Sequence, residues 1–420
     1  MKLSSSFVAL SAIFGSIFAS AAPIRSRQAN LAPSFNSGAA YFISNEPTGN
    51  FVVSADIGTD GQLSLARAFA TNGRGQHGND GKNGSDPLFS QGSVKANVAA
   101  GLVAAVNPGS NSVSLFKIDP NTPSMLTAFG SPMSTGGEFP MSLAFNQDGS
   151  MLCVLNGGAI NGVKCFTMDQ TLGLVPAANT WRPLGLNQTT PPTGPAGSAS
   201  HIIFTEDQKN VIVAVKGNAD LGMGGFLAAW DVMPDASLSS NFTRMALPAG
   251  GNIPFSLGVI PGKNSLLVTD AAVGIDVVDT AAGLAAASTS NRSTTLPVPG
   301  QTAICWNAFS RSTGNFYVTD IATSLVTEVN VDDNLKPTMV KQYPTQPNAA
   351  TLDLDVASVG GKDYLYVLMP NVTSVEVMSL NAPGNATTIQ TLALTAPASM
   401  QNLSISAQFL QGMTVYVKPQ

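Results

Sequence analysis

The chain has 420 residues, of which only 11% are charged, and its formal net charge is −5. Soluble proteins usually have about 25% charged residues, so solubility here depends on Ser, Thr, Asn and Gln. The few cations are scattered along the sequence, which excludes nucleic acid and anionic membranes as expected partners.

The N-terminus has the layout of a secretory signal peptide. Lys2 precedes an apolar stretch over residues 7–18, and small residues then permit cleavage after Ala21. The stretch is shorter than the roughly 20 apolar residues that cross a membrane, so we expect a secreted or cell-wall protein with no membrane span. Residues 22–37 are predicted to be a linker or short pro-segment, and residues 38–420 a single domain.

This domain contains a β-hairpin that is repeated seven times. Each copy has an apolar run, a short loop and a second β-rich run. The apolar runs end at Asn45, Asn107, Asn156, Lys216, Asp270, Asp320 and Met369. Repeats of this size without helical periodicity predict an all-β, seven-bladed β-propeller, with a solenoid or sandwich as the alternative. Because the first runs are almost continuously apolar, we expect them to be the inner strands of the blades.

Two long loops and the end of the chain depart from the repeat. Residues 71–90 and 182–200 make two intervals longer than the others. Loops of this length in a compact domain are functional or disordered, and we expect them over one rim or over the channel mouth. The β-rich segment 414–417 is predicted to complete the first blade and to remove an exposed sheet edge.

The cysteines and the glycosylation sequons fit an exported protein. Cys153 and Cys165 flank a short turn and are predicted to form a disulfide across a hairpin, which leaves Cys305 as a buried free thiol. The seven sequons begin at Asn83, Asn187, Asn241, Asn291, Asn371, Asn385 and Asn402. Their number predicts N-glycosylation, and any asparagine that carries a glycan must lie on the surface.

Motifs for cofactor or metal binding are weak. Residues Gly73–Gly78 match G-x-G-x-x-G, but turn formers rather than a helix follow, so neither a nucleotide nor another cofactor is expected. Two histidines and three cysteines are too widely separated for a zinc site. Asp80 with Asp86, and Asp353 with Asp355, are interpreted as solvated carboxylates rather than calcium ligands. We therefore expect no metal.

Four residues are candidates for a site in or over the channel. His201 opens the strand Ser198–Phe204 of the fourth blade, where it could face the axis, and is the catalytic candidate. A histidine packed between blades is the alternative. His77 in the glycine-rich loop, Gln91 and Arg182 are the candidates for the channel mouth.

With these repeats, the sequence resembles the 3-carboxymuconate cyclase and lactonase group of seven-bladed propellers. It is most similar to the secreted fungal branch of cell-surface glycoproteins. The resemblance covers nearly the whole mature chain. The stretches that carry it are YFISNEPTGN from Tyr41, DPLFSQGSV from Asp86, ICWNAFS from Ile304 and GNFYVTD from Gly314.

The resemblance implies a catalytic histidine at or beside His201, an arginine opening the next blade and a glutamate ending its inner strand. The last two positions hold Phe255 and either Asp270 or Ala271, so the cation that would bind a substrate carboxylate is missing. We favour a monomeric, secreted glycoprotein that adheres to extracellular-matrix or cell-wall components. The alternative is a cyclase or lactonase that acts on a small carboxylate or lactone in a rearranged site, where Arg182 or Arg244 could replace the arginine.

Overall fold

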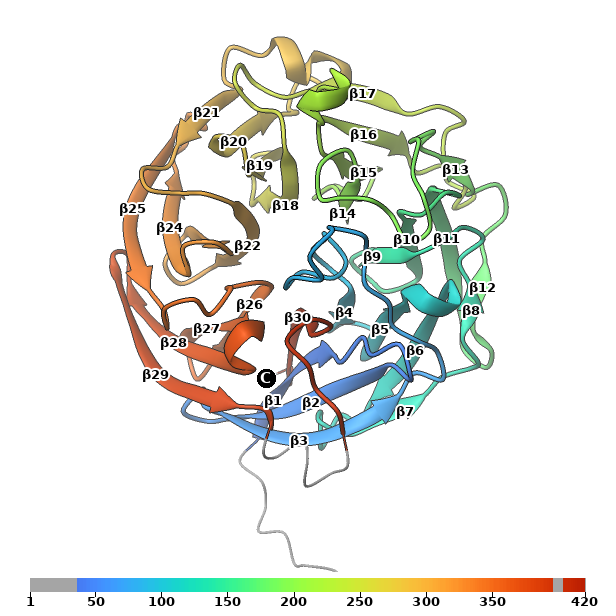
Figure 1. The fold of residues 1–420 in the computed structure, drawn as a ribbon, viewed down its shortest axis with the longest axis vertical. Helices are drawn as coiled ribbons and strands as arrows, with labels where there is room; N and C mark the ends of the chain where they lie inside the picture. The colour runs from blue at the N-terminus through green and yellow to red at the C-terminus, as the bar shows by residue number, and fades with distance from the viewer. Residues whose placement is uncertain (1–35, 396–402, 420) are drawn as a thin grey trace, which may run out of the picture. The chain divides into compact units, whose positions relative to one another are not determined.

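The computed structural model describes residues 36–395 and 403–419, which form an all-β propeller of seven blades (Figure 1). The predicted fold class is confirmed. The predicted signal peptide and residues 22–35 of the predicted linker lie outside the described residues. In the part of the chain that is described, no helix is long and apolar enough to cross a membrane.

Each blade is an antiparallel sheet of four main strands. Blade 1 contains β30 (Gln411–Val417), β1 (Asn36–Ile43), β2 (Phe51–Gly58) and β3 (Leu63–Ala70), and blade 2 contains β4 (Val94–Asn97), β5 (Leu102–Asn107), β6 (Ser112–Ile118), β7 (Leu126–Ala128) and β8 (Met133–Ser134). Blade 3 contains β9 (Pro140–Phe145), β10 (Met151–Asn156), β11 (Gly162–Asp169), β12 (Gly173–Pro176) and β13 (Arg182–Pro183), and blade 4 contains β14 (Ala199–Phe204), β15 (Asn210–Val215), β16 (Phe226–Asp231) and β17 (Thr243–Ala246). Blade 5 contains β18 (Pro254–Ile260), β19 (Ser265–Asp270), β20 (Gly274–Asp279) and β21 (Thr294–Pro297), blade 6 contains β22 (Ile304–Ser310), β23 (Asn315–Asp320), β24 (Leu325–Val331) and β25 (Pro337–Pro344), and blade 7 contains β26 (Leu354–Val359), β27 (Lys362–Met369), β28 (Ser374–Ala382) and β29 (Asn385–Ala393). Short 3-10 helices lie in the loops: η1 (Pro108–Ser110), η2 (Ala219–Leu221), η3 (Leu284–Thr289) and η4 (Pro370–Val372).

The strand nearest the axis is not the one that the apolar runs predicted. In blade 3, for example, the run forms β10, which is buried along its whole length and pairs with β9 on one edge and β11 on the other. β9 lies at the centre of the ring (Figure 1). The prediction of the inner strands was therefore wrong by one strand. Continuous apolar character marks a strand with neighbours on both edges and both faces, whereas the axial strand has one edge towards the channel.

The end of the chain closes the ring. β30 pairs with β1, with Val415 opposite Ala40, and becomes the axial strand of blade 1. The prediction that residues 414–417 complete the first blade is confirmed. Because β30 occupies the inner edge of β1, that edge is not left as an open template for another strand.

The polar side chain at the end of an apolar run binds the backbone of the loop that leads into its blade from the preceding blade. The Asp270 carboxylate accepts backbone N–H bonds from Asn252 at 2.7 Å and Ile253 at 3.0 Å. The Asp320 carboxylate accepts the equivalent bonds from the backbone before β22. Side chains of this kind provide partners for loop N–H groups that no strand can reach. In blade 4 this position holds Lys216, which has a different role.

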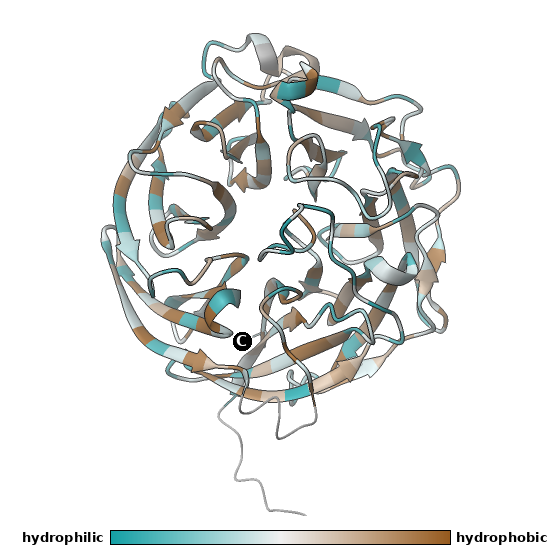
Figure 2. Ribbon diagram, viewed as in Figure 1, coloured by the Kyte–Doolittle hydropathy of each residue, from teal (hydrophilic) through white to brown (hydrophobic). Residues whose placement is uncertain are grey.

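The cysteines and sequons lie as follows. Cys153 and Cys165 are opposite each other on β10 and β11 and form a disulfide, as predicted. Cys305 is a buried free thiol. The asparagines of six sequons are exposed, and Asn402 lies outside the described residues. Figure 2 shows the hydrophobic residues concentrated in the strands, with many polar residues in the outer turns and long loops.

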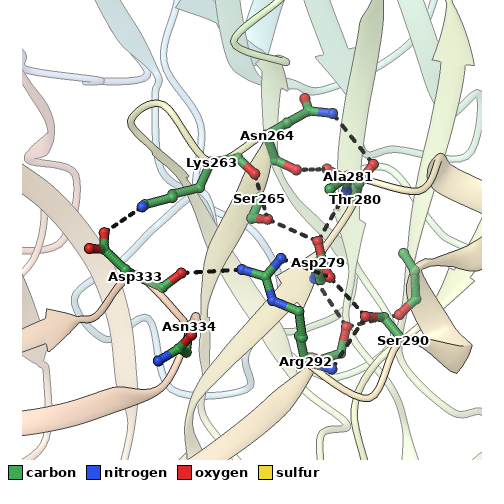
Figure 3. A network of polar contacts seen from close by, with 12 residues as sticks. Lys263, Asn264, Ser265, Asp279, Thr280, Ala281, Ser290, Arg292, Asp333 and Asn334 are labelled. Atoms are coloured by element: carbon green, nitrogen blue, oxygen red, sulfur yellow. Dashed lines mark hydrogen bonds and ion pairs between the residues drawn. The ribbon is translucent and has the colours of Figure 1, made fainter.

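A polar network joins blades 5 and 6 at the turns β18–β19, β20–β21 and β24–β25 (Figure 3). Asp279 lies 3.8 Å from the Arg292 guanidinium and accepts a hydrogen bond from Ser290. Lys263 pairs with Asp333 of the next blade, whose side chain is 94% exposed. Exposed pairs of this kind contribute about 1 kcal/mol or less. The charged groups bond to one another, so this network is a link between blades and not a ligand site.

Candidate functional site

The central channel is filled on one face by the chain itself. Residues Asp86–Ser93, which we call the plug segment, enter the channel from the loop between blades 1 and 2, and all of them are buried (Figure 1). Asp86 and Phe89 have φ angles of 69° and 55°. A bulky residue rarely adopts such a conformation, so strong contacts must hold the segment in place.

Gln91, a predicted channel-mouth residue, lies inside the channel and binds across it. Its side-chain amide forms two hydrogen bonds with the backbone of Asn307 in blade 6, at 2.9 and 3.2 Å. Its backbone N–H donates to Ser200 O of blade 4, and its carbonyl accepts from Ser142 Oγ of blade 3 at 2.6 Å. The polar groups of Gln91 are therefore used within the chain and do not face a ligand.

A second residue of the plug segment is held by blades 6 and 1. The Ser90 carbonyl accepts hydrogen bonds from Trp306 Nε1 at 3.0 Å and from Gln411 Nε2 at 2.9 Å. Ser90 Oγ donates to Met141 O of blade 3. Blades 1, 3, 4 and 6 thus all bind the plug segment.

A buried ionisable pair is formed by Asp86 of the plug segment and Lys216 of blade 4. Lys216 is fully buried, and its ammonium donates to Phe89 O at 2.7 Å and to Ala199 O at 2.9 Å. Burial lowers the pKa of Lys216 to about 7 and raises the pKa of Asp86 to about 7, and the two charges act against these shifts. The Lys216 ammonium also lies 4.7 Å from the ring centroid of Phe255. A cation is therefore present beside the position where the family resemblance implies an arginine, but it holds the plug.

His201 is on the axial strand β14, as predicted, and is only 2% exposed. Its Nδ1 accepts the Leu257 N–H at 3.0 Å. Burial lowers the pKa of His201 well below 6.5, and the nearby Lys95 ammonium lowers it further. The imidazole is therefore neutral, with its proton on Nε2, and Nε2 has no partner among residues 36–395 and 403–419.

The two aspartates on the strand side of the channel are not solvated. Asp353 is fully buried, and burial raises its pKa to about 8. Its carboxylate accepts from the Gly412 N–H at 3.0 Å. Asp355 is partly buried and accepts from the N–H groups of Val356 and Val415 at 2.8 and 3.0 Å. Their interpretation as solvated carboxylates was wrong because the strands of blades 7 and 1 enclose them. The same interpretation was wrong for Asp86, which is buried in the plug segment. Among the described residues there is no cluster of three His, Cys, Asp or Glu that could hold a metal.

The two long loops lie over the plugged end of the channel, as predicted. Asn79 pairs with Thr193, with hydrogen bonds to the carbonyl of Pro192 and from the N–H of Gly194. His77 has both ring nitrogens within 2.7 Å of backbone carbonyls of its own loop. This imidazole stabilises the loop and does not point at an open site.

The glycine-rich motif serves close packing rather than phosphate binding. A Cβ on Gly75 would lie 1.7 Å from Asn45 O, and one on Gly78 would lie 2.4 Å from the Phe89 ring. Only glycine allows these approaches. Asp80, in the same loop, accepts N–H groups of the following turn.

Arg182 lies in β13 and not at an open channel mouth. Its guanidinium donates to the carbonyls of Ser239 at 2.6 Å, Trp181 at 2.7 Å and Asn179 at 2.9 Å. The side chain is 7% exposed. All three guanidinium nitrogens therefore bind backbone, so Arg182 does not supply the cation that a carboxylate substrate needs.

Lys216, Asn307 and Gln411 are important residues of the channel that sequence reasoning missed. Lys216 had a detectable signal, because it is the one cation among the seven residues that end the apolar runs. Asn307 binds the Gln91 side chain through its backbone, so its residue type gave no signal of this contact.

The comparisons with known proteins concern the fold. No protein-family model matches the sequence, and no curated protein matches it. Among solved structures, the chain is similar to the periplasmic gluconolactonase of Pseudomonas aeruginosa, with 14% identity, a TM-score of 0.62 and coverage of 91% of this chain and 100% of that chain. It is also similar to a functionally unknown protein of Desulfotomaculum acetoxidans, with 11% identity, a TM-score of 0.60 and the same coverage. At these identities the similarity establishes a lactonase-like, seven-bladed propeller fold.

Proposed function

We propose that the protein is a secreted, N-glycosylated propeller that binds extracellular-matrix or cell-wall components and has no lactone-hydrolysing or cyclising activity. The observation that carries this proposal is the plug segment, which fills the channel on the side of the long loops. A reaction site needs groups that a substrate can reach. Here Gln91, Lys216 and Arg182 all bind the chain's own backbone.

The positions of the sequons support binding on the opposite side, which we call the open face. It carries the turns between the third and fourth strands of each blade and those between the first and second strands of blades 2–7. Asn241, Asn291 and Asn385 lie at turns of this face in blades 4, 5 and 7. No described sequon lies on the open face of blades 1–3. Glycans are bulky, so this sector is the part of the open face best suited to contact a large partner.

The same sector contains a cavity of about 660 Å³ between blades 2 and 3. Its lining combines apolar side chains, including Val98 and Phe129, with the charged groups of Lys117 and Asp148. Val98 is 47% exposed. Mixed apolar and polar linings are typical of binding surfaces.

The test is a solid-phase binding assay of the glycosylated protein on immobilised matrix and wall components. Val98→Glu should weaken binding at least tenfold. Leu221→Glu is the matched control, because Leu221 is 74% exposed but lies in η2, between the second and third strands of blade 4. If no component binds saturably, or if both variants bind as the wild type does, the proposal is wrong.

The alternative is a lactonase. The observation that favours it is the His201 Nε2–H, which has no partner in the part of the chain that the structure describes. A neutral imidazole beside a cation could donate to a lactone oxygen. The gluconolactonase similarity gives the substrate to try. Turnover of glucono-lactone by the purified protein, abolished in His201→Ala, would replace the binding proposal with this one.

A further inference from the structure

We propose that the open face has a small-molecule site at the channel mouth, and that its ligand is an amphiphilic carboxylate of the medium-chain fatty acid type. This site is separate from the surface proposed for a large partner. It therefore stands whether or not matrix or wall components bind.

The site is a cup of about 360 Å³ formed by axial strands of blades 2–5. This volume is near the lower end of the usual range for small-molecule sites, about 300–1,000 Å³. Its wall is mainly apolar and includes Phe145 of β9, Ile203 of β14 and Val259 of β18. All three are partly exposed. Hydrocarbon is the natural occupant of such a wall, because contact removes apolar surface from water on both sides.

The polar groups at the rim of the cup are already paired. Asn97 Nδ2 donates to Asn146 O at 3.0 Å, and Gln208 Nε2 donates to Thr205 O at 2.8 Å. Gln208 Oε1 accepts the Gln147 N–H at 2.8 Å. These groups make the rim rigid and leave Lys95 as the cation available inside the cup.

Lys95 is half-buried in the wall of the cup. Within residues 36–395 and 403–419 it forms no ion pair within 4.0 Å and donates no side-chain hydrogen bond. An ammonium group partly removed from water without such a partner is costly. A carboxylate ligand would supply the partner.

The Lys95 charge lowers the pKa of Asp353 and of Asp355, but among the described residues neither carboxyl lies within 4.0 Å of the ammonium. Asp355 points its oxygens at the N–H groups of β26 and β30. The Asp353 carboxyl accepts from Gln411 and Gly412, and its raised pKa keeps it protonated at neutral pH. His201 is neutral. The Lys95 ammonium is therefore the group in the cup that can favour an anionic ligand over a cationic one.

His201 lies behind Lys95, outside the lining of the cup. A Cβ on Gly92 would lie 3.2 Å from Lys95 Cε and 3.3 Å from His201 Cδ2, so both side chains lie against the same point of the plug segment. The His201 Nε2–H is buried and unpartnered among the described residues. Because Lys95 lines the cup and His201 does not, the Lys95 ammonium is the group that binds the carboxylate there, with a charge-assisted bond. The hydrocarbon chain would then lie along Phe145, Ile203 and Val259.

The probe is decanoate, titrated calorimetrically into the full glycosylated chain. Decanoate should bind more tightly than octanoate, by about fourfold for each added CH₂ that is buried. Lys95→Met keeps the length of the side chain and should weaken decanoate binding at least tenfold. Lys362→Met is the matched control, because Lys362 is exposed at the turn between the first and second strands of blade 7, on the same face and outside the cup, and this variant should bind as the wild type does.

Wild-type protein alone also tests the proposal, in case Lys95→Met does not fold. Decanoate should bind at least tenfold more tightly than decanol or decyltrimethylammonium. Equal binding of decanoate and decanol would mean that the cup takes any hydrocarbon and that Lys95 selects nothing. Tighter binding of the cationic amphiphile would mean that Asp355 governs the cup. Either result, or no decanoate binding at millimolar concentration, overturns the proposal.

Discussion

Replacing Lys216 by methionine removes the cation that holds the plug segment and keeps a side chain of similar length. Lys216 donates to Phe89 O of the plug and to Ala199 O of β14, and neither the ammonium nor these carbonyls can reach water. The same change removes the positive charge that favours ionised Asp86. Lys216→Met should therefore loosen the plug and destabilise the fold together.

The magnitude follows from the two bonds. A hydrogen bond from a charged donor contributes about 1.5–3 kcal/mol, and breaking a buried charged pair costs about 3–5 kcal/mol. Part of the cost is avoided because Asp86, with its raised pKa, can take up a proton. We expect the free energy of unfolding to fall by about 3–5 kcal/mol.

Urea unfolding followed by tryptophan fluorescence measures this loss, because Trp306 donates to the plug carbonyl of Ser90. Hydrogen exchange of peptides covering the plug segment should also rise. Lys209→Met is the matched control. Its side chain is 79% exposed and its ion pair with Asp207 spans 3.5 Å, so it should lose no more than about 1 kcal/mol.

Two results would refute this reasoning. A loss below about 1 kcal/mol for Lys216→Met would mean that the plug does not depend on the ammonium. Unchanged exchange in the plug, together with a large loss of stability, would mean that Lys216 supports blade 4 and not the plug. Adding Asp86→Asn should recover part of the loss, because the two residues are coupled.

Burial raises the pKa of Asp276 to about 8, so its contribution to stability is complete below about pH 4 and is lost as the pH rises through 8. Asp276→Asn should lessen the fall of the unfolding temperature between pH 4 and 8, and an unchanged pH profile would contradict the raised pKa. Removing the disulfide with Cys153→Ala and Cys165→Ala should lower the free energy of unfolding in urea by about 3 kcal/mol. Equal urea midpoints for wild type and variant would show that the disulfide does not stabilise the fold. Gly75→Ala should increase protease cleavage within residues 73–93, because the added Cβ has no space, whereas Gly224→Ala, where nothing lies within 4 Å, should not.

The sequence predicted the blades well because strands buried on every side leave a continuous apolar signal. Runs such as β10 and β27 were found for this reason, and the pairing of the cysteines followed from the hairpin between them. Apart from β14 and the end of β30, the axial strands were missed because their burial depends on the closure of the ring. The short β4 contains both Lys95 and Asn97, and nothing local marks it as part of the channel wall.

The candidate site was harder to predict because side-chain identity does not show where a polar group is used. Gln91 was predicted at the channel mouth and lies in the channel, but its bonds go to the backbone of a strand more than 200 residues away. Arg182 has the charge that a substrate anion needs, yet local carbonyls take all three of its nitrogens. Lys216 ends an apolar run, where a solvated lysine would be ordinary, and only the arrangement of blades buries it.

The pairing of β30 with β1 has a consequence for how the protein is made. β30 is synthesised long after the strand that it completes, and its Gln411 also holds the plug through Ser90. Until residues 411–417 have emerged, the first blade lacks its axial strand and the plug lacks one of its supports. Ring closure and channel closure are therefore late events of biogenesis, and they depend on the same seven residues.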